Sequence, residues 1–321
     1  MKRAELPNVL GNLRCPVCQH NGWWVSLGAA AIRSNSTISK FRCGRCGKKI
    51  VIKISHGGSA QSVIKREFDV LIAMSKLHSQ EEHFRFLTPL AYAAASDNEM
   101  MVTELVEGPD LAGCARMLPI ARSSWIYGLA GKLLRKLHEA CSERHLQAVD
   151  LQEKVTYLNV NYGSLLDRMN ISRNAFDALR SASVSLHGER MLWTWGHGDF
   201  KPQNVIYDGD GIVAFDTTLD NVGAFIFDIG QFLANIELLF LGWKDKAEDI
   251  RPKLASEFLN GYDLSTSDGL SAVAWAQLYF TLAYYGEYCA SGTVRKIVAW
   301  RVFGGAIDRS TRQLVEAIGK V

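Results

Sequence analysis

WGHGDFKPQN (residues 195–204), followed by IVAFD (residues 212–216), is the most informative stretch of the 321-residue sequence. It contains the order H-x-D-x-K-x-x-N and then a hydrophobic run that ends in an aspartate. This pattern predicts a polar loop followed by a β-strand. One loop would carry Asp199 and Asn204, and the end of the strand would bring Asp216 to face Asn204.

These three side chains suit the transfer of a phosphoryl group to an alcohol. That reaction needs a carboxylate near the attacking hydroxyl and ligands for Mg²⁺ on the nucleotide phosphates. Asp199 suits the first task. Asn204 and Asp216 offer the hard oxygen ligands that Mg²⁺ prefers. Each residue alone would be interpreted as a turn former or a cap, so the prediction rests on their occurrence in this order.

The composition is typical of a folded protein, because 48% of the residues are apolar and 21% are charged. A net charge of +3 argues neither for nor against an anionic partner. Residues 1–16 lack the apolar segment of a signal peptide, and polar residues interrupt the most apolar stretch, residues 225–243. We therefore expect a cytoplasmic protein without a membrane span.

The sequence is rich in β-strand signals before Glu107-Gly108-Pro109 and in helical periodicity after it. We predict an α+β fold of two lobes, with a β-rich N-lobe over residues 1–107 and a mostly helical C-lobe over residues 108–321. The expected strands are 40–43, 49–54, 90–95 and 100–105, and the expected helices are 61–77, from Ser123 or Ser124 to about 141, 151–182, 250–260, 270–290 and 294–318.

Four of the seven cysteines form two C-x-x-C pairs, Cys15/Cys18 and Cys43/Cys46. Two such knuckles supply a tetrahedral set of four thiolates, which is the closed geometry of a structural zinc site. Residues 19–42 between the pairs are slightly more than a zinc ribbon usually has, so they should contain a hairpin. We predict a zinc-ribbon-like element over about residues 12–50, inside the N-lobe.

The motifs together resemble the aminoglycoside phosphotransferase and choline kinase-like branch of the protein-kinase-like fold. The catalytic loop of that family reads approximately H-G-D-x-x-x-x-N, which residues 197–204 match, and the next hydrophobic strand ends in Asp216. Leu134-Arg-Lys-Leu-His138 matches the family's L-x-x-L-H helix end. Asp228 in Phe227-Asp-Ile-Gly matches a further aspartate, which the resemblance implies to hold the catalytic loop through backbone N–H groups.

The resemblance implies ATP and Mg²⁺ as cofactors and adds a set of nucleotide-binding residues. It implies that Lys53 binds the α/β-phosphates, that Glu67 orients Lys53, and that the nucleotide base meets the backbone of the linker that includes Glu104 and Val106. Lys201 stands where protein kinases carry a lysine near the transferred phosphate, although the small-molecule branch often lacks one. The stretch that resembles the family's phosphate loop is Ser34, Asn35, Ser36 and Thr37; its alternative interpretation is a plain polar turn.

Two features favour a small molecule or glycan over a protein as the phosphate acceptor. Gly198 replaces the arginine that reads a phosphorylated activation loop, and Asp216 is followed by Thr217 instead of Phe-Gly. Residues 217–227 are too few for an activation loop with a peptide platform. The alternatives are a protein or other macromolecular kinase, and a non-catalytic zinc-ribbon pseudokinase scaffold that binds nucleic acid or protein. The sequence does not identify the acceptor or the oligomeric state.

Overall fold

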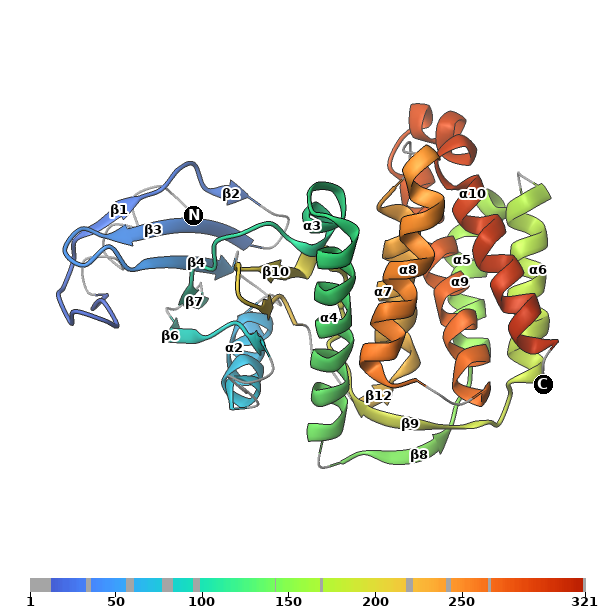
Figure 1. The fold of residues 1–321 in the computed structure, drawn as a ribbon, viewed down its shortest axis with the longest axis horizontal. Coiled ribbons are helices and arrows are strands. Elements are labelled where there is room, and N and C mark those ends of the chain that lie inside the picture. Colours follow the sequence, from blue (N-terminus) through green and yellow to red (C-terminus); the bar gives the residue numbers. More distant parts are fainter. Residues whose placement is uncertain are drawn as a thin grey trace.

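The computed structural model describes residues 13–32, 36–55, 61–76, 83–94, 99–141, 143–167, 170–217, 222–240, 244–264 and 267–319. Its N-terminal part is built on an antiparallel sheet with the strand order β1-β3-β4-β7-β6, in which β2 also pairs with β3 (Figure 1). The strands are β1 (Trp24–Ser26), β2 (Ala31–Ile32), β3 (Ser36–Cys43), β4 (Lys49–Ser55), β6 (Pro89–Ala94) and β7 (Glu99–Glu104).

Buried and partly exposed side chains alternate along β4, so the two faces of the sheet differ. Ile50, Ile52 and Ile54 are buried on one face, in a cluster that includes Val102. Leu13 and Trp24, from the segment around the first cysteine pair, pack against this cluster. The N-terminal segment therefore covers a sheet face that would otherwise expose a row of isoleucines to water.

Lys53 points to the opposite face, where helix α2 (Gln61–Ser75) packs. The buried contact there joins Ile64 and Leu71 of the helix to Met101 of β7. The apolar spacing of the helix thus turns one side to the sheet and, on the same side, places Glu67 beside Lys53.

The C-terminal part is mostly helical and contains the main hydrophobic core (Figure 1). Its helices are α3 (Leu111–Met117), α4 (Ile120–Ala140), α5 (Gln152–Leu166), α6 (Asn170–Ser185), α7 (Ile226–Leu238), α8 (Lys244–Tyr262), α9 (Ser267–Ala290) and α10 (Thr293–Ile318). Helices α4 and α8 pack closely at glycines: a Cβ atom on Gly131 would overlap the carbonyl oxygen of Phe258, whereas one on Gly128 would meet nothing nearer than 3.6 Å.

Two small sheets lie in or beside the C-terminal part. One has the order β12-β9-β8, and the other has the order β10-β11-β5, with β11 parallel to β5. The strands are β5 (Phe84–Phe86), β8 (His145–Ala148), β9 (Arg190–Trp195), β10 (Val205–Tyr207), β11 (Ile212–Ala214) and β12 (Val222–Ala224). Strand β5 precedes the strands β6 and β7 of the N-terminal sheet in the chain, yet it pairs with the strand that leads to Asp216.

The predicted α+β architecture is confirmed, and the differences are local. Helix α4 begins at Ile120 after Pro119, not at Ser123 or Ser124, because the carbonyl of Pro119 already accepts the N–H of Arg122 and Ser123. The predicted helix 151–182 consists of two helices, α5 and α6. The boundary at residue 107 stays a prediction. No helix among the described residues is long and apolar enough to cross a membrane.

Candidate active site

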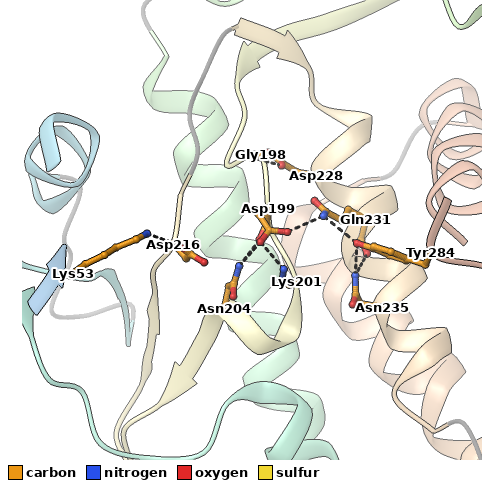
Figure 2. A network of polar contacts seen from close by, with 10 residues as sticks. All are labelled: Lys53, Gly198, Asp199, Lys201, Asn204, Asp216, Asp228, Gln231, Asn235 and Tyr284. Atoms are coloured by element: carbon orange, nitrogen blue, oxygen red, sulfur yellow. Dashed lines mark hydrogen bonds and ion pairs between the residues drawn. The ribbon is translucent and has the colours of Figure 1, made fainter. Parts of the chain in front are cut away.

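The loop between β9 and β10 contains the H-x-D-x-K-x-x-N residues. Gly198 adopts a φ of +79°, a conformation that glycine adopts without strain, and a short 3₁₀ helix, η3 (Pro202–Asn204), closes the loop. Asp228, in the first turn of α7, accepts hydrogen bonds from the backbone N–H of His197 (2.6 Å) and of Gly198 (2.9 Å). The buried carboxylate of Asp228 therefore fixes the loop immediately before Asp199 (Figure 2).

Asp228 is in turn held by a buried histidine. Nε2 of His138 lies 3.2 Å from the Asp228 carboxylate, and Nδ1 of His138 lies 2.7 Å from the hydroxyl of Tyr262 on α8. Burial opposes the charge of Asp228, but the hydrogen bond and charge of His138, together with the contacts of His197, outweigh burial and lower the pKa of Asp228. The chain of contacts links helices α4, α7 and α8 to the catalytic loop.

The carboxylate of Asp199 accepts three hydrogen bonds. Its Oδ2 atom accepts from Nζ of Lys201 at 2.5 Å and from Nδ2 of Asn204 at 2.9 Å. Its Oδ1 atom accepts from Nε2 of Gln231, on α7, at 3.0 Å. Figure 2 shows Asp199 at the centre of these contacts. The carboxylate is therefore held from both sides.

Asp216 follows strand β11 and adopts the left-handed conformation, with φ of +60°. The N–H of the preceding residue, Phe215, donates to the carbonyl of Asn204 (3.0 Å), which places Asp216 beside the end of the catalytic loop. Oδ1 of Asp216 accepts from Nζ of Lys53 at 3.0 Å. Burial opposes the charge of Asp216, but the Lys53 ammonium outweighs it and lowers the pKa of Asp216.

Lys53 also contacts Glu67, at 2.7 Å from Oε2. Burial disfavours the lysine charge, but the two carboxylates outweigh burial and raise the pKa of Lys53. For Glu67, which is 7% exposed, burial raises the pKa against the attraction of Lys53. The lysine and two acids from β4, α2 and the segment after β11 thus meet at one point.

The remaining predicted nucleotide-binding residues lie along the sheet and the linker. The side chain of Glu104 pairs with Arg85 and accepts the N–H of Thr88 at 3.1 Å, and the N–H of Glu104 donates to the carbonyl of Thr88 at 3.2 Å. The N–H of Leu105, next to Val106, donates to the carbonyl of Lys49 (3.1 Å). Ser36 and Thr37 begin strand β3, whereas Ser34 and Asn35 lie outside the described residues.

The four predicted zinc ligands lie together at one end of the N-terminal sheet. The sulfur atoms of Cys15, Cys18, Cys43 and Cys46 all lie within 4.8 Å of one another. The second pair forms the turn between β3 and β4. The stretch between the two pairs contains β1 and β2, each of which pairs antiparallel with β3, as the hairpin prediction requires. A hydrogen bond from the backbone of Cys46 lowers the pKa of Cys43 to about 6, which favours the thiolate that binds metal.

The phosphotransferase enzyme family matches residues 29–275 of the chain. The protein belongs to this family. It is therefore a kinase that transfers phosphate to a hydroxyl group. No curated protein sequence matches the chain.

Two solved structures of other proteins have a fold similar to that of this phosphotransferase. An amicoumacin kinase in complex with AMP-PNP, Ca²⁺ and Ami is 16% identical, with a TM-score of 0.61 over 96% of this chain and 91% of that chain. A choline/ethanolamine kinase family protein from Mesorhizobium loti is 15% identical, with a TM-score of 0.52 over 91% and 88% of the two chains. The kinase-like fold that the sequence motifs predicted is confirmed.

Sequence reasoning missed part of the surroundings of Asp199 in this phosphotransferase. Gln231 contacts the carboxylate and also donates to the hydroxyl of Tyr284, on α9, at 3.0 Å. Asn235, one turn along α7, donates to the same hydroxyl at 3.0 Å. A signal existed, since Gln231 and Asn235 stand with Asp228 and Glu237 as the polar residues of a mostly apolar helix.

Proposed function

We propose that the protein transfers the γ-phosphoryl group of ATP, with Mg²⁺, to a hydroxyl group of a small molecule or glycan. The observation that carries this proposal is the meeting of Lys53, Asp199, Asn204 and Asp216 at the junction of the sheet and the helical part (Figure 2). A phosphoryl transferase needs its phosphate ligand, metal ligands and acceptor-side carboxylate within one site.

The donor set fits a magnesium ion. Both hydrogens of the Asn204 amide nitrogen are used on Asp199, because Nδ2 donates to the backbone carbonyl and to Oδ2, both at 2.9 Å. The amide oxygen of Asn204 is thereby turned away from Asp199. This oxygen and the carboxylate of Asp216 are hard ligands from neighbouring segments. When bound, the metal would neutralise charge on the nucleotide phosphates.

Each protein group has one task in the proposed reaction. Asp199 accepts the proton of the acceptor hydroxyl while the oxygen of that hydroxyl bonds to the γ-phosphorus. The bond from this phosphorus to the bridging oxygen breaks, and ADP leaves with the electron pair. Lys53, held by Glu67, binds the α/β-phosphates, and the linker backbone at Glu104 and Val106 binds the base. Lys201, at 2.5 Å from Asp199, restrains the carboxylate and stabilises negative charge as the phosphoryl group moves.

We further propose that the cysteine cluster binds a structural zinc ion. Four thiols around one point leave no coordination position open for a substrate, so the site suits a structural and not a catalytic metal. The proposed metal joins the N-terminal segment that covers the sheet to the β3–β4 hairpin that carries Lys53. Its task would be to keep the outer sheet face covered.

The deciding experiment is an ATP-consumption screen of the purified protein against sugars, polyols, aminoglycosides, nucleosides and amino alcohols with a single hydroxyl. We expect Mg²⁺-dependent formation of ADP and of a phosphorylated product with at least one of these acceptors. A peptide array treated with labelled ATP is the parallel measurement. Labelled peptides together with no small-molecule product would replace this proposal with a macromolecular kinase.

A further inference from the structure

The carboxylate of Asp199 has one hydrogen-bonding position left, and its location is defined. An ionised carboxylate offers about four lone-pair positions, two on each oxygen. Lys201 and Asn204 occupy both positions on Oδ2, whereas Gln231 alone occupies Oδ1. The position that remains for an acceptor hydroxyl is therefore on Oδ1, the oxygen that also accepts from Gln231 of α7.

The hydroxyl of Tyr284, which also contacts Gln231, has a proton that it does not donate to any described residue. Its oxygen accepts from Gln231 and from Asn235, which uses both lone pairs. Neither amide takes a proton in return, since each bond is donated by the amide nitrogen. No acceptor among the described residues contacts the Tyr284 O–H.

The amide nitrogens that donate to Tyr284 have no hydrogen left for another partner. Nε2 of Gln231 donates its two hydrogens to Asp199 and Tyr284. Nδ2 of Asn235 donates its two hydrogens to Tyr284 and to the backbone carbonyl of Gln231. Both amides are buried, with exposed fractions of 7% and 8%. Because every hydrogen of the two amide nitrogens is bonded, the network restricts the orientation of the Tyr284 hydroxyl.

The free position on Oδ1 and the free proton of Tyr284 are close enough to serve one molecule. Both groups contact the same atom, Nε2 of Gln231, each at 3.0 Å, so they are separated by no more than two hydrogen-bond lengths (Figure 2). Tyr284 is only partly buried, and the exposed Glu287 lies one turn further along α9.

We propose that Tyr284 donates a hydrogen bond to a second oxygen of the phosphate acceptor, adjacent to the hydroxyl that attacks. The acceptor would then be a vicinal diol or polyol, with one oxygen on Oδ1 of Asp199 and its neighbour on Tyr284. A monohydric alcohol would offer the Tyr284 proton no partner, and the loss of this hydrogen bond in the transition state lowers its rate of reaction. This inference rests on the proposed function and names the chemical class of its acceptor.

The test compares the best polyol acceptor from the screen with its monodeoxy derivatives, using the full-length protein and Mg-ATP. We expect wild-type kcat/KM to fall about tenfold for the derivative that lacks the oxygen next to the phosphorylated hydroxyl, the scale of one neutral hydrogen bond. Tyr284→Phe should lose about the same factor on the parent acceptor and should no longer distinguish the two. Its KM for ATP should stay at the wild-type value, whereas its melting temperature should fall, because the buried amides of Gln231 and Asn235 lose their acceptor.

Tyr288→Phe is the matched control, because Tyr288 is one turn further along α9 and its ring packs against Phe303. It should retain the wild-type preference. If Tyr284→Phe lowers the rates on parent and derivative equally and keeps the preference, the hydroxyl only supports Gln231 and the inference is wrong.

The screen separates this inference from the proposed function. Transfer to amino alcohols with a single hydroxyl, and to no polyol, would leave the phosphotransferase intact and overturn the role of Tyr284. Transfer to no hydroxyl compound of any kind would overturn both.

Discussion

Lys53, in the N-terminal sheet, forms an ion pair of 3.0 Å with Asp216, which follows a strand of the helical part. The same ammonium group contacts Glu67 at 2.7 Å. One side chain therefore connects the helix that packs on the sheet to the strand end where we place a magnesium ligand. The predictions below start from this junction and move outward.

Asp199→Asn should reduce phosphoryl transfer by about 10²–10⁴-fold, the contribution expected of a general base. The amide keeps the size of the side chain, so ATP binding should change little. Single-turnover rates and a nucleotide titration measure the two properties separately. Asp210→Asn, an exposed change in the turn after β10, is the control and should keep full activity. Turnover of Asp199→Asn within twofold of wild type would remove Asp199 from the mechanism.

Asp216→Asn should weaken the binding of Mg-ATP, because it removes the charge of a metal ligand. Asparagine suits the test, since it tolerates the φ of +60° that alanine would adopt only with strain. Calorimetric titration with ATP should show a loss of the Mg²⁺-dependent part of the affinity. Unchanged affinity in the presence of Mg²⁺ would mean that another group binds the metal; Asp220, outside the described residues, is the next acid to test.

The purified protein should contain one zinc ion per chain, and Cys43→Ser should lower the zinc content and the melting temperature together. ATP binding should also weaken, although no proposed ATP contact is altered, because β4 carries both Lys53 and one end of the zinc hairpin. Arg45→Ser changes an exposed residue of the same turn and should keep the metal. If removal of zinc changes neither melting nor ATP binding, the element is independent of the sheet.

Gly131→Ala should destabilise the protein by about 1–3 kcal/mol, the usual cost of overpacking. The added methyl group would overlap the backbone of α8 at Phe258. Gly128→Ala, one turn earlier on α4, has 3.6 Å of space and should be neutral or slightly stabilising. Urea denaturation of the two variants is the comparison. Equal stability would mean that α4 and α8 adjust their separation easily.

The free energy of unfolding should decrease as the pH falls below about 6.5, with His197 as one cause. Its ring is completely buried, both ring nitrogens lack hydrogen-bond partners, and burial lowers the pKa of His197 from its ordinary value of 6.5. The unfolded chain then binds a proton that the folded protein does not, so acid favours unfolding. Above this pH both states are neutral and the effect vanishes.

His197→Leu isolates that contribution, because every other titrating group stays in place. The free energy of unfolding of wild type relative to this variant should be lower at pH 5.5 than at pH 7.5. Denaturant titrations at the two pH values provide the measurement. A stability difference that is the same at both would show that His197 does not titrate on unfolding.

The parts of the site that lie close together in the sequence were the parts that sequence reasoning could place. Asp199 and Asn204 share one loop, and the second cysteine pair lies in one hairpin turn, so spacing alone constrained their geometry. The pairing of Lys53 with Glu67 required the family resemblance, because nothing local connects a strand to the following helix.

The contact between Gln231 and Tyr284 depends on how α7 packs against α9, and no local pattern specifies that packing. The predicted start of α4, at Ser123 or Ser124, was wrong for a related reason. Ser123 fits the composition of a helix cap, but in the structure its hydroxyl is buried and donates to the carbonyl of Cys114 at 3.2 Å. Tertiary contacts overrode the local preference.

The pairing of β5 with β11 determines how the two parts of the molecule can move. Within the described residues the chain passes between them at Leu87–Thr88 and again at the linker after Glu104, and these crossings are bonded to each other through Thr88 and Glu104 (3.2 Å). The N–H of Leu87 is also tied to the carbonyl of Ala214 (2.8 Å). Two chain crossings that are hydrogen-bonded to each other restrain relative rotation more than one crossing would. We therefore expect the N-terminal sheet and the helical part to open and close about one axis at this junction, on either side of Asp216.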